Sequence, residues 1–241
     1  MKYLKKYSLP CICVVISVLI LFLSFNTSSK VSVLAVYEES VMDYPTVIVD
    51  AGHGGEDGGA QSASGLLEKD VNLAIALYLR DFLITAGFDV VMIREDDKQI
   101  YDESANTLRE KKVSDTHNRL NICNQDDDSI YVSIHQNMFS ESKYSGAQVF
   151  YSPNNELSVA LAESVRNSFV SLLQPDNKRG VKSSTESIYI LDNAKTPCIL
   201  IECGFLSNDK ESALLATEWY RKNIAFAVHL GIIEYCYNNL K

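Results

Sequence analysis

Short, continuously apolar runs in this chain end at side chains that bind metals or carry protons. The run 47–49 leads into Asp50-Ala51-Gly52-His53-Gly54-Gly55, the run 130–134 into His135-Gln136-Asn137, and the run 199–201 into Glu202. Short apolar runs of this kind are typical of strands that are buried on both faces. The carboxyl ends of parallel strands meet at one edge of a sheet, where ligands bind. We therefore expect these three segments to face one cleft.

Helical patterns alternate with the strands. Strands are predicted at 47–50, 89–93, 130–134, 147–151, 188–191 and 199–201, and helices at about 68–86, 109–124, 157–172 and 220–239. Glu68 opens the first helix, and Gly87 follows its end, as is common for a helix stop. This alternation predicts an α/β fold with a mostly parallel, mixed central sheet of about six strands, flanked by helices in a single catalytic domain.

The N-terminus has a different character. Lys2, Lys5 and Lys6 precede an uncharged run at 9–25, which is near the lower length limit of a membrane-spanning helix. We interpret 1–29 as a membrane anchor or signal segment, 30–44 as a linker and 45–241 as the catalytic domain. A cleaved signal peptide, with cleavage near Val33-Leu34-Ala35, is the alternative. In both cases the basic flank stays cytoplasmic and the domain lies outside the cytoplasm.

The net charge and the spacing of the cysteines argue against two classes of ligand, nucleic acids and thiolate-bound metals. The chain of 241 residues carries a formal net charge of -9, which argues against a nucleic-acid partner because phosphate binding relies on clustered Lys and Arg. None of the six cysteines stands in a Cys-x-x-Cys pair typical of a thiolate metal site. Cys198 and Cys203, five residues apart on one strand, point to opposite faces and cannot pair with each other. We interpret the cysteines as buried thiols.

Each candidate residue has an ordinary structural alternative. His53 lies in a Gly-rich turn, which elsewhere cradles phosphate, although the spacing here fits neither the dinucleotide nor the Walker pattern. Glu68 suits the first turn of a helix without any further role, and His135 could be a core histidine. Glu202 is harder to explain, because an unpaired carboxylate after a buried strand is costly. Together, two His and two Glu are the inventory of a catalytic zinc site.

The two other histidines follow no strand. His117 lies in a polar helical stretch and His229 in the last helix, and we predict a structural role for both.

These segments together resemble one family, the zinc-dependent N-acetylmuramoyl-L-alanine amidases of type 3. The resemblance is carried by 50–55, 65–69, 133–137 and 202–208 in this order, and by Arg119 and Asn124 ahead of the central strand. It extends over nearly all of the chain from Thr46 onward. Two departures are slight: Gly58 stands where a proline is common, and Cys203 where a small residue is common.

The resemblance implies one Zn²⁺ per domain, bound by His53, Glu68 and His135, with Glu202 as the catalytic acid/base. Three protein ligands leave zinc an open position for water, and Glu202 would move the proton from that water to the departing amine. The implied scissile bond joins N-acetylmuramic acid to L-alanine in peptidoglycan. Asn137 and Arg119 are predicted as substrate contacts, although a turn-stabilising role is equally open for Asn137.

Within the family, the size and layout resemble the germination-specific, sporulation-type members. This implies removal of stem peptides from spore cortex glycan, as the first step to muramic δ-lactam, in the space between the membranes where cortex forms. Peptidoglycan strands with stem peptides and, through the N-terminal segment, the membrane are then the partners, and an activating protein partner is left open. The alternatives are another cell-wall zinc hydrolase, such as a carboxypeptidase or sugar deacetylase, and a catalytically silent wall-binding protein of the same fold.

Overall fold

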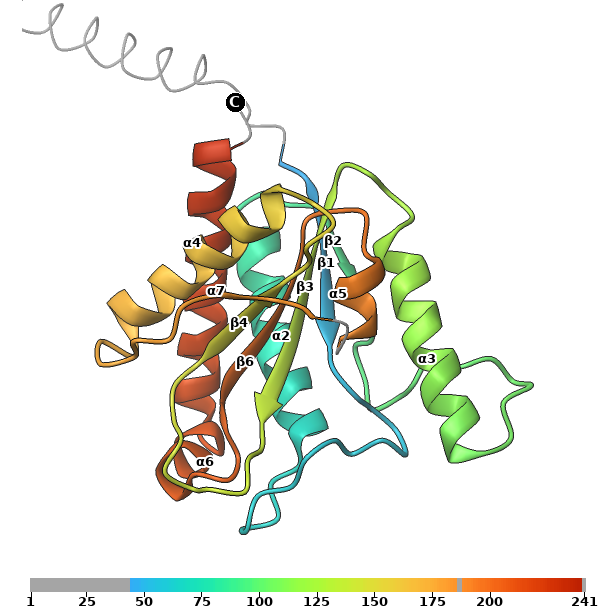
Figure 1. Cartoon of the computed structure of the whole chain (residues 1–241), viewed down its shortest axis with the longest axis horizontal. Helices are drawn as coiled ribbons and strands as arrows, with labels where there is room; N and C mark the ends of the chain where they lie inside the picture. Colours follow the sequence, from blue (N-terminus) through green and yellow to red (C-terminus); the bar gives the residue numbers. More distant parts are fainter. Residues whose placement is uncertain (1–43, 186–187, 240–241) are drawn as a thin grey trace, which may run out of the picture. The chain divides into compact units, whose positions relative to one another are not determined.

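A six-stranded mixed sheet forms the centre of the computed structural model, which describes residues 44–185 and 188–239 (Figure 1). The strands are β1 (Thr46–Ala51), β2 (Val90–Met92), β3 (Ser129–Asn137), β4 (Gln148–Tyr151), β5 (Lys182–Ser183) and β6 (Cys198–Phe205). Their order across the sheet is β2-β1-β3-β6-β4-β5. The strands β2, β1, β3 and β6 are parallel, and β4 runs antiparallel to β6. The predicted fold class is confirmed.

Helices cover both faces of this sheet. One layer is formed by α2 (Glu68–Thr85), α4 (Leu157–Leu172) and α7 (Glu218–Asn239), in which α7 packs against both α2 and α4. The opposite face carries α3 (Leu108–Cys123) and the short α5 (Tyr189–Asn193), which touch each other (Figure 1). A further short helix, α6 (Asp209–Leu215), follows β6. A cavity lies on the α3/α5 face of the sheet, between the strands and these two helices.

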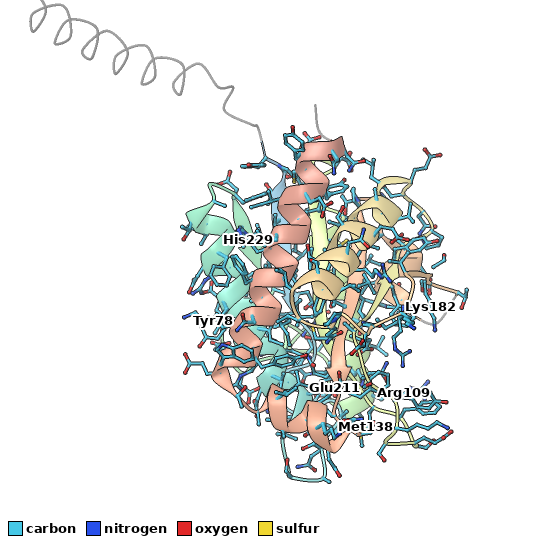
Figure 2. All side chains as sticks on the ribbon, turned by 90° about the vertical axis from the view of Figure 1, so that its left-hand side faces the viewer. Tyr78, Arg109, Met138, Lys182, Glu211 and His229 are labelled. Carbon is cyan, nitrogen blue, oxygen red and sulfur yellow. The ribbon has the colours of Figure 1, made fainter. Side chains whose placement is uncertain are left out.

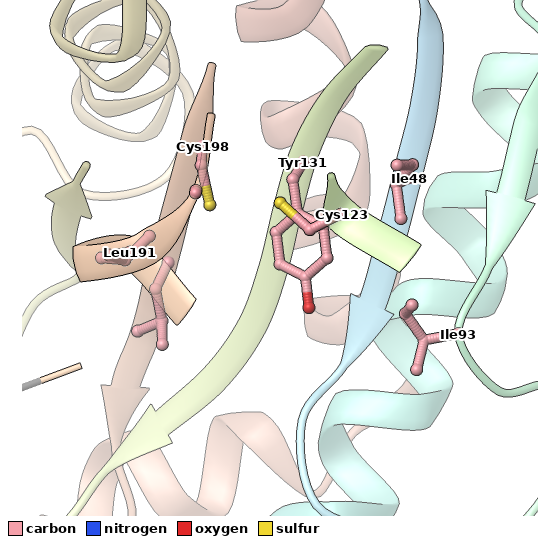
Figure 3. Close-up of a cluster of buried hydrophobic side chains, with 8 residues drawn as sticks. Ile48, Ile93, Cys123, Tyr131, Leu191 and Cys198 are labelled. Carbon is pink, nitrogen blue, oxygen red and sulfur yellow. The ribbon is translucent and has the colours of Figure 1, made fainter. Parts of the chain in front are cut away.

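Side chains that alternate along the central strands build the core on the α3/α5 face. Ile48, Tyr131 and Leu200 come from β1, β3 and β6 and pack with Cys123 of α3 and Leu191 of α5 (Figure 3). All five are buried. Toward the carboxyl edge the same alternation brings polar side chains onto this face, so the site shares a face with this core.

One predicted strand was wrong. Ile188 precedes α5 and residues 189–191 form its start, and the short strand β5 at Lys182–Ser183 is the sixth strand of the sheet. A four-residue apolar run fits a buried strand or a helix turn equally well. Here the Asp192 carboxylate accepts a hydrogen bond from the backbone N–H of Ile188 at 3.2 Å and stabilises the first turn of α5. The other five strands and the four predicted helices are confirmed within a few residues.

The predicted anchor at 1–29 and all of the linker except Tyr44 lie outside the described residues. Within 44–185 and 188–239, no helix is long and apolar enough to cross a membrane. The four described cysteines are free thiols and buried, as predicted.

Candidate active site

Three side chains converge at the carboxyl edge of the sheet. His53 follows β1, Glu68 is the first residue of α2, and His135 lies near the end of β3. Their ligand atoms all lie within 4.8 Å of one another. The Glu68 carboxylate lies between the two rings, with Oε2 3.2 Å from His53 Nε2 and Oε1 2.9 Å from His135 Nδ1. This donor set of two imidazoles and one carboxylate suits a zinc ion.

Two glycines make room for this cluster. A Cβ at Gly52 would lie 2.2 Å from His135 Nε2, so only glycine lets that ring lie against the β1 turn. A Cβ at Gly59, whose φ is +67°, would lie 2.6 Å from Glu68 Oε2. His53 itself has a φ of 62°, which is unusual for a residue other than glycine. The Gly-rich turn predicted from the sequence therefore serves close packing of the cluster.

Neighbouring groups orient the cluster. His53 Nδ1 lies 2.9 Å from Asp57 Oδ2, which leaves Nε2 turned toward Glu68. The Glu68 carboxylate, which is 4% exposed, accepts hydrogen bonds from the backbone N–H of Ala60 at 2.8 Å and of Gln136 at 3.1 Å. Carboxylate partners of this kind orient metal-binding histidines in other proteins.

The protonation of the cluster follows from these contacts. Burial lowers the pKa of His53, but its hydrogen bonds to Asp57 and Glu68 outweigh this and raise the pKa to about 9. Burial opposes ionisation of Glu68, yet the hydrogen bonds to His135 and His53 hold the pKa of its carboxyl well below the usual range. The cluster therefore keeps a negative charge at its centre, where a cation is favoured.

Glu202 lies beside this cluster on β6. It is the direct neighbour of His135 across the parallel β3–β6 pair. Its Oε2 atom is buried and has no hydrogen-bond partner among residues 44–185 and 188–239. Burial raises the pKa of the Glu202 carboxyl to about 7, because it outweighs the lowering effect of His135 and His53, and the negative charge of Glu68 adds to the rise. A group with this pKa can both accept and donate a proton near neutral pH.

Beneath His53, a buried ionic network holds the backbone of the turn. Arg119 forms ion pairs with Asp50 and, at 2.7 Å, with Asp115, and it donates to the carbonyls of residues 51 and 53. Arg94 donates to the carbonyls of residues 51 and 52 at 2.8 and 3.1 Å. Both arginines are at most 4% exposed. This geometry favours a positioning role for Arg119 over the predicted substrate contact.

The predicted substrate contact Asn137 lies at the end of β3 and is half-buried. Its backbone carbonyl accepts a hydrogen bond from Leu206 N at 2.8 Å, which ties β3 to the loop after β6. This bond uses the main chain, and both roles that the sequence left open for the amide side chain stay predictions.

A cavity opens from the cluster across the α3/α5 face. Its walls come from β1, β3, α3 and α5, and they include His53, His135, Lys112, Thr116 and Tyr189.

Of the two histidines predicted as structural, His229 packs between Phe82 and Phe226 in the α2/α7 layer (Figure 2). His117 is exposed on α3, and its ring lies 5.0 Å from that of Tyr189.

With this geometry in place, comparison with known proteins identifies the class. The model of the N-acetylmuramoyl-L-alanine amidase family matches residues 47–234. The chain belongs to this family, and it is a hydrolase of the amide bond between N-acetylmuramic acid and L-alanine in peptidoglycan.

Among similar proteins is the germination-specific N-acetylmuramoyl-L-alanine amidase of Bacillus subtilis (strain 168). It is 34% identical over 189 residues, which cover 78% of this chain and 78% of that protein. The structure of the CwlD amidase from Clostridioides difficile in complex with the GerS lipoprotein is 40% identical, with a TM-score of 0.77, and the match covers 81% of this chain and 100% of that chain. The N-acetylmuramoyl-L-alanine amidase from Clostridium difficile 630 is 29% identical over 82% of this chain and 99% of that chain, with a TM-score of 0.71.

Sequence reasoning missed several residues that build the site. Asp57, Gly59 and Arg94 lie in irregular loops, where no periodicity marks them. A usable signal existed for Asp50, which follows the apolar run 47–49 as Glu202 follows the run 199–201, because a buried acid needs a partner.

Proposed function

We propose that this chain is a zinc-dependent amidase that removes stem peptides from spore cortex glycan. The observation that carries the zinc centre is the convergence of His53, Glu68 and His135 from three separate elements within 4.8 Å. The donor chemistry fits zinc, because histidine nitrogen and carboxylate oxygen are its usual ligands and three protein ligands are typical of a catalytic site. Bound there, zinc supplies an activated water and polarises the amide carbonyl.

Glu202 carries the proton in this proposal. Its buried, unpartnered Oε2 lies on the strand next to His135 and takes the proton of the attacking water. The same carboxyl then delivers that proton to the departing amine of L-alanine, so that a neutral amine leaves. In the metal-free protein burial raises the pKa of Glu202 to about 7, above the usual range of a carboxyl, which favours proton uptake by this group. Asp57 and the backbone donors at Ala60 and Gln136 keep the ligand side chains in place.

Two measurements test the centre and the reaction. His135→Ala should abolish stable zinc binding, since two ligands make a poor zinc site; full zinc occupancy in this variant would reject the assignment. Mass spectrometry of peptidoglycan digested with the purified protein should find stem peptides with a free L-alanine amino terminus. Products shortened at the peptide carboxyl end, or deacetylated sugars, would contradict the amidase reaction.

The cortex role is supported by the similarity to a germination-specific amidase and to the CwlD structure. Deleting the gene should leave vegetative growth and spore formation largely intact. The spores should lack muramic δ-lactam and fail late in germination. Normal δ-lactam in cortex digests of the deletion strain would reject this role and leave the amidase reaction untouched.

We also propose that the catalytic domain lies outside the cytoplasm and that a protein partner activates it. The similar CwlD chain was solved together with a lipoprotein, which supports an activating partner for this chain. The described chain begins at Tyr44, at the amino end of β1, whereas His53 follows the carboxyl end of that strand. In this proposal the segment at 1–29 tethers the catalytic domain to a membrane. Co-purification with membrane after N-terminal tagging tests the tether.

A further inference from the structure

An exposed aromatic pair stands at the rim of the cavity described above. Tyr189 of α5 is 46% exposed and lines the cavity, and its ring lies 5.0 Å from that of His117 on α3, at an interplanar angle of 33°. Neither ring belongs to the core of the domain. We propose that Tyr189 and His117 form a glycan subsite, which packs against the C–H face of a pyranose ring of the substrate. This inference rests on the proposed function and names where the sugar lies.

The position of Glu202 determines on which side the sugar must lie. Glu202 protonates the amine of L-alanine, so the peptide lies on the β6 side of the metal cluster. In the sheet order, β6 and β4 lie on one side of β3, and β1 lies on the other. The carbonyl and the muramic acid attached to it therefore extend toward β1 and the α3 flank. Most of the strand residues that line the cavity between the cluster and the aromatic pair belong to β1 and β3, and Leu200 comes from β6, so the cavity lies mainly on this side.

The chemistry of the cavity fits a sugar. A pyranose ring has an apolar C–H face and polar edges, and aromatic rings bury such apolar surface effectively. Lys112 and Thr116, one turn apart on α3, line the same cavity and supply polar groups for the hydroxyl and acetamido oxygens of the sugar. His117 also lines a second, mostly polar hollow along α3, which includes Ser104, Thr107 and Ser114. The pair thus stands between two hollows, as a contact for an extended glycan strand requires.

Hydrogen bonds join the ends of the two helices that carry the pair. Asn124, just after α3, donates to the carbonyl of Asn193 at 3.2 Å and accepts from the N–H of Lys195 at 2.8 Å, which joins the ends of the two helices. Asn154 Nδ2 donates to the carbonyl of Asp192 at 2.7 Å from the opposite side. A preorganised aromatic surface loses little conformational entropy on binding.

The opposite rim has a different character, which fits the peptide. Met138 and Phe139, about half exposed, follow β3, and the side chains of Lys143 and Arg179 lie against neighbouring aromatic rings there. Cations favour the carboxylates of a stem peptide. The α3/α5 rim combines an exposed aromatic pair with the hydroxyl group of Thr116, and the charge of Lys112 there is already paired with Asp57 at 3.2 Å, so the sugar is favoured there.

The test uses a peptide-free tetrasaccharide of alternating N-acetylglucosamine and N-acetylmuramic acid, titrated into the zinc-loaded full chain by calorimetry. Tyr189→Ala should weaken binding roughly five- to tenfold, the loss of about one aromatic contact, and Tyr189→Phe should retain it. His117→Ala should weaken it in the same direction. With glycan carrying stem peptides, the change in Tyr189→Ala should fall on KM more than on kcat.

Trp219→Ala is the matched control, because Trp219 is 66% exposed on α7, in the helical layer of the other face, and should bind like the parent. Circular dichroism and zinc content confirm that each variant is folded and loaded. Parent-like tetrasaccharide binding in both Tyr189→Ala and His117→Ala would overturn the subsite, as would a parent that releases stem peptides but binds no tetrasaccharide. Because the titration needs no hydrolysis, a parent that binds the sugar but releases no stem peptide would instead overturn the proposed function.

Discussion

Adding one methyl group at Gly52 should disable the metal centre. A Cβ there would lie 2.2 Å from Nε2 and 2.3 Å from Cε1 of His135. Ordinary contacts between such atoms begin near about 3.5 Å, so the ring of His135 would have to retreat by roughly 1 Å or more. The φ of Gly52 lies outside the left-handed region, so the effect of Gly52→Ala is steric rather than a backbone conformational strain. A misplacement of about 1 Å costs roughly 100-fold in rate.

Three measurements separate the consequences. Zinc affinity, measured by competition with a chelator, should fall by at least about tenfold, and release of stem peptides by roughly 100-fold. Thermal unfolding of the metal-free protein should show a loss of about 1–3 kcal/mol, typical of overpacking. Gly58→Ala is the control in the same loop, because its Cβ would meet only Leu67 Cδ2 at an ordinary 3.6 Å. A Gly52→Ala protein with the zinc affinity and turnover of the parent would refute this reasoning.

Four further predictions test other parts of the site. Glu202→Gln should keep the fold and zinc but lose at least about 100-fold in turnover, and near-normal turnover would show that another group carries the proton. The raised pKa of Glu202 means that its ionised carboxylate destabilises the folded, metal-free protein. The melting temperature of the wild type should therefore fall relative to that of Glu202→Gln as pH rises from 4.5 through about 7. A difference in melting temperature between the two proteins that does not change with pH would contradict this. Asp57→Asn should lower zinc affinity roughly 10- to 100-fold by removing the carboxylate partner of His53, and unchanged chelator competition would show that the ring needs no such partner. Arg119→Met should cost about 3–5 kcal/mol in denaturant unfolding, because it leaves Asp50 buried without its cation; a loss below about 1 kcal/mol would argue against a buried pair.

The parts of the fold predicted well from sequence are those with a periodic pattern. β1, β3 and β6 are mostly apolar and almost entirely buried, and helix α4 carries one apolar stripe. The run 188–191 was misassigned, because four apolar residues have no period that separates a strand from a helix turn. Its state depends on the contacts of Leu191 in the core and of Asp192 at the start of α5, which no local pattern reveals.

In the candidate site, too, the residues on strands could be predicted from the sequence, whereas the residues in loops could not. His53, His135 and Glu202 were placed together because parallel strands share a carboxyl edge, and this convergence follows from topology alone. The loop between β1 and α2 has no such rule. Its course depends on distant partners: Gly55 N donates to Asp97 Oδ1 at 2.7 Å, and Lys69 Nζ donates to the Gly55 carbonyl at 2.8 Å. Contacts across 14 and 42 residues of sequence are invisible to patterns of period two or 3.6.

The buried charges beneath His53 support the backbone of the turn rather than the overall stability of the fold. A pair such as Arg119 with Asp50 adds little net stability, because desolvation opposes the attraction. An apolar replacement, however, could not satisfy the three consecutive carbonyls of residues 51–53, which point inward where β1 gives way to the metal turn. Arg119 and Arg94 provide donors at this point, and Asp50 and Asp115 balance their charge. The network therefore supports an irregular turn in which His53 has a left-handed backbone conformation. The desolvation cost of its buried charges is found at the place where the metal centre needs this turn.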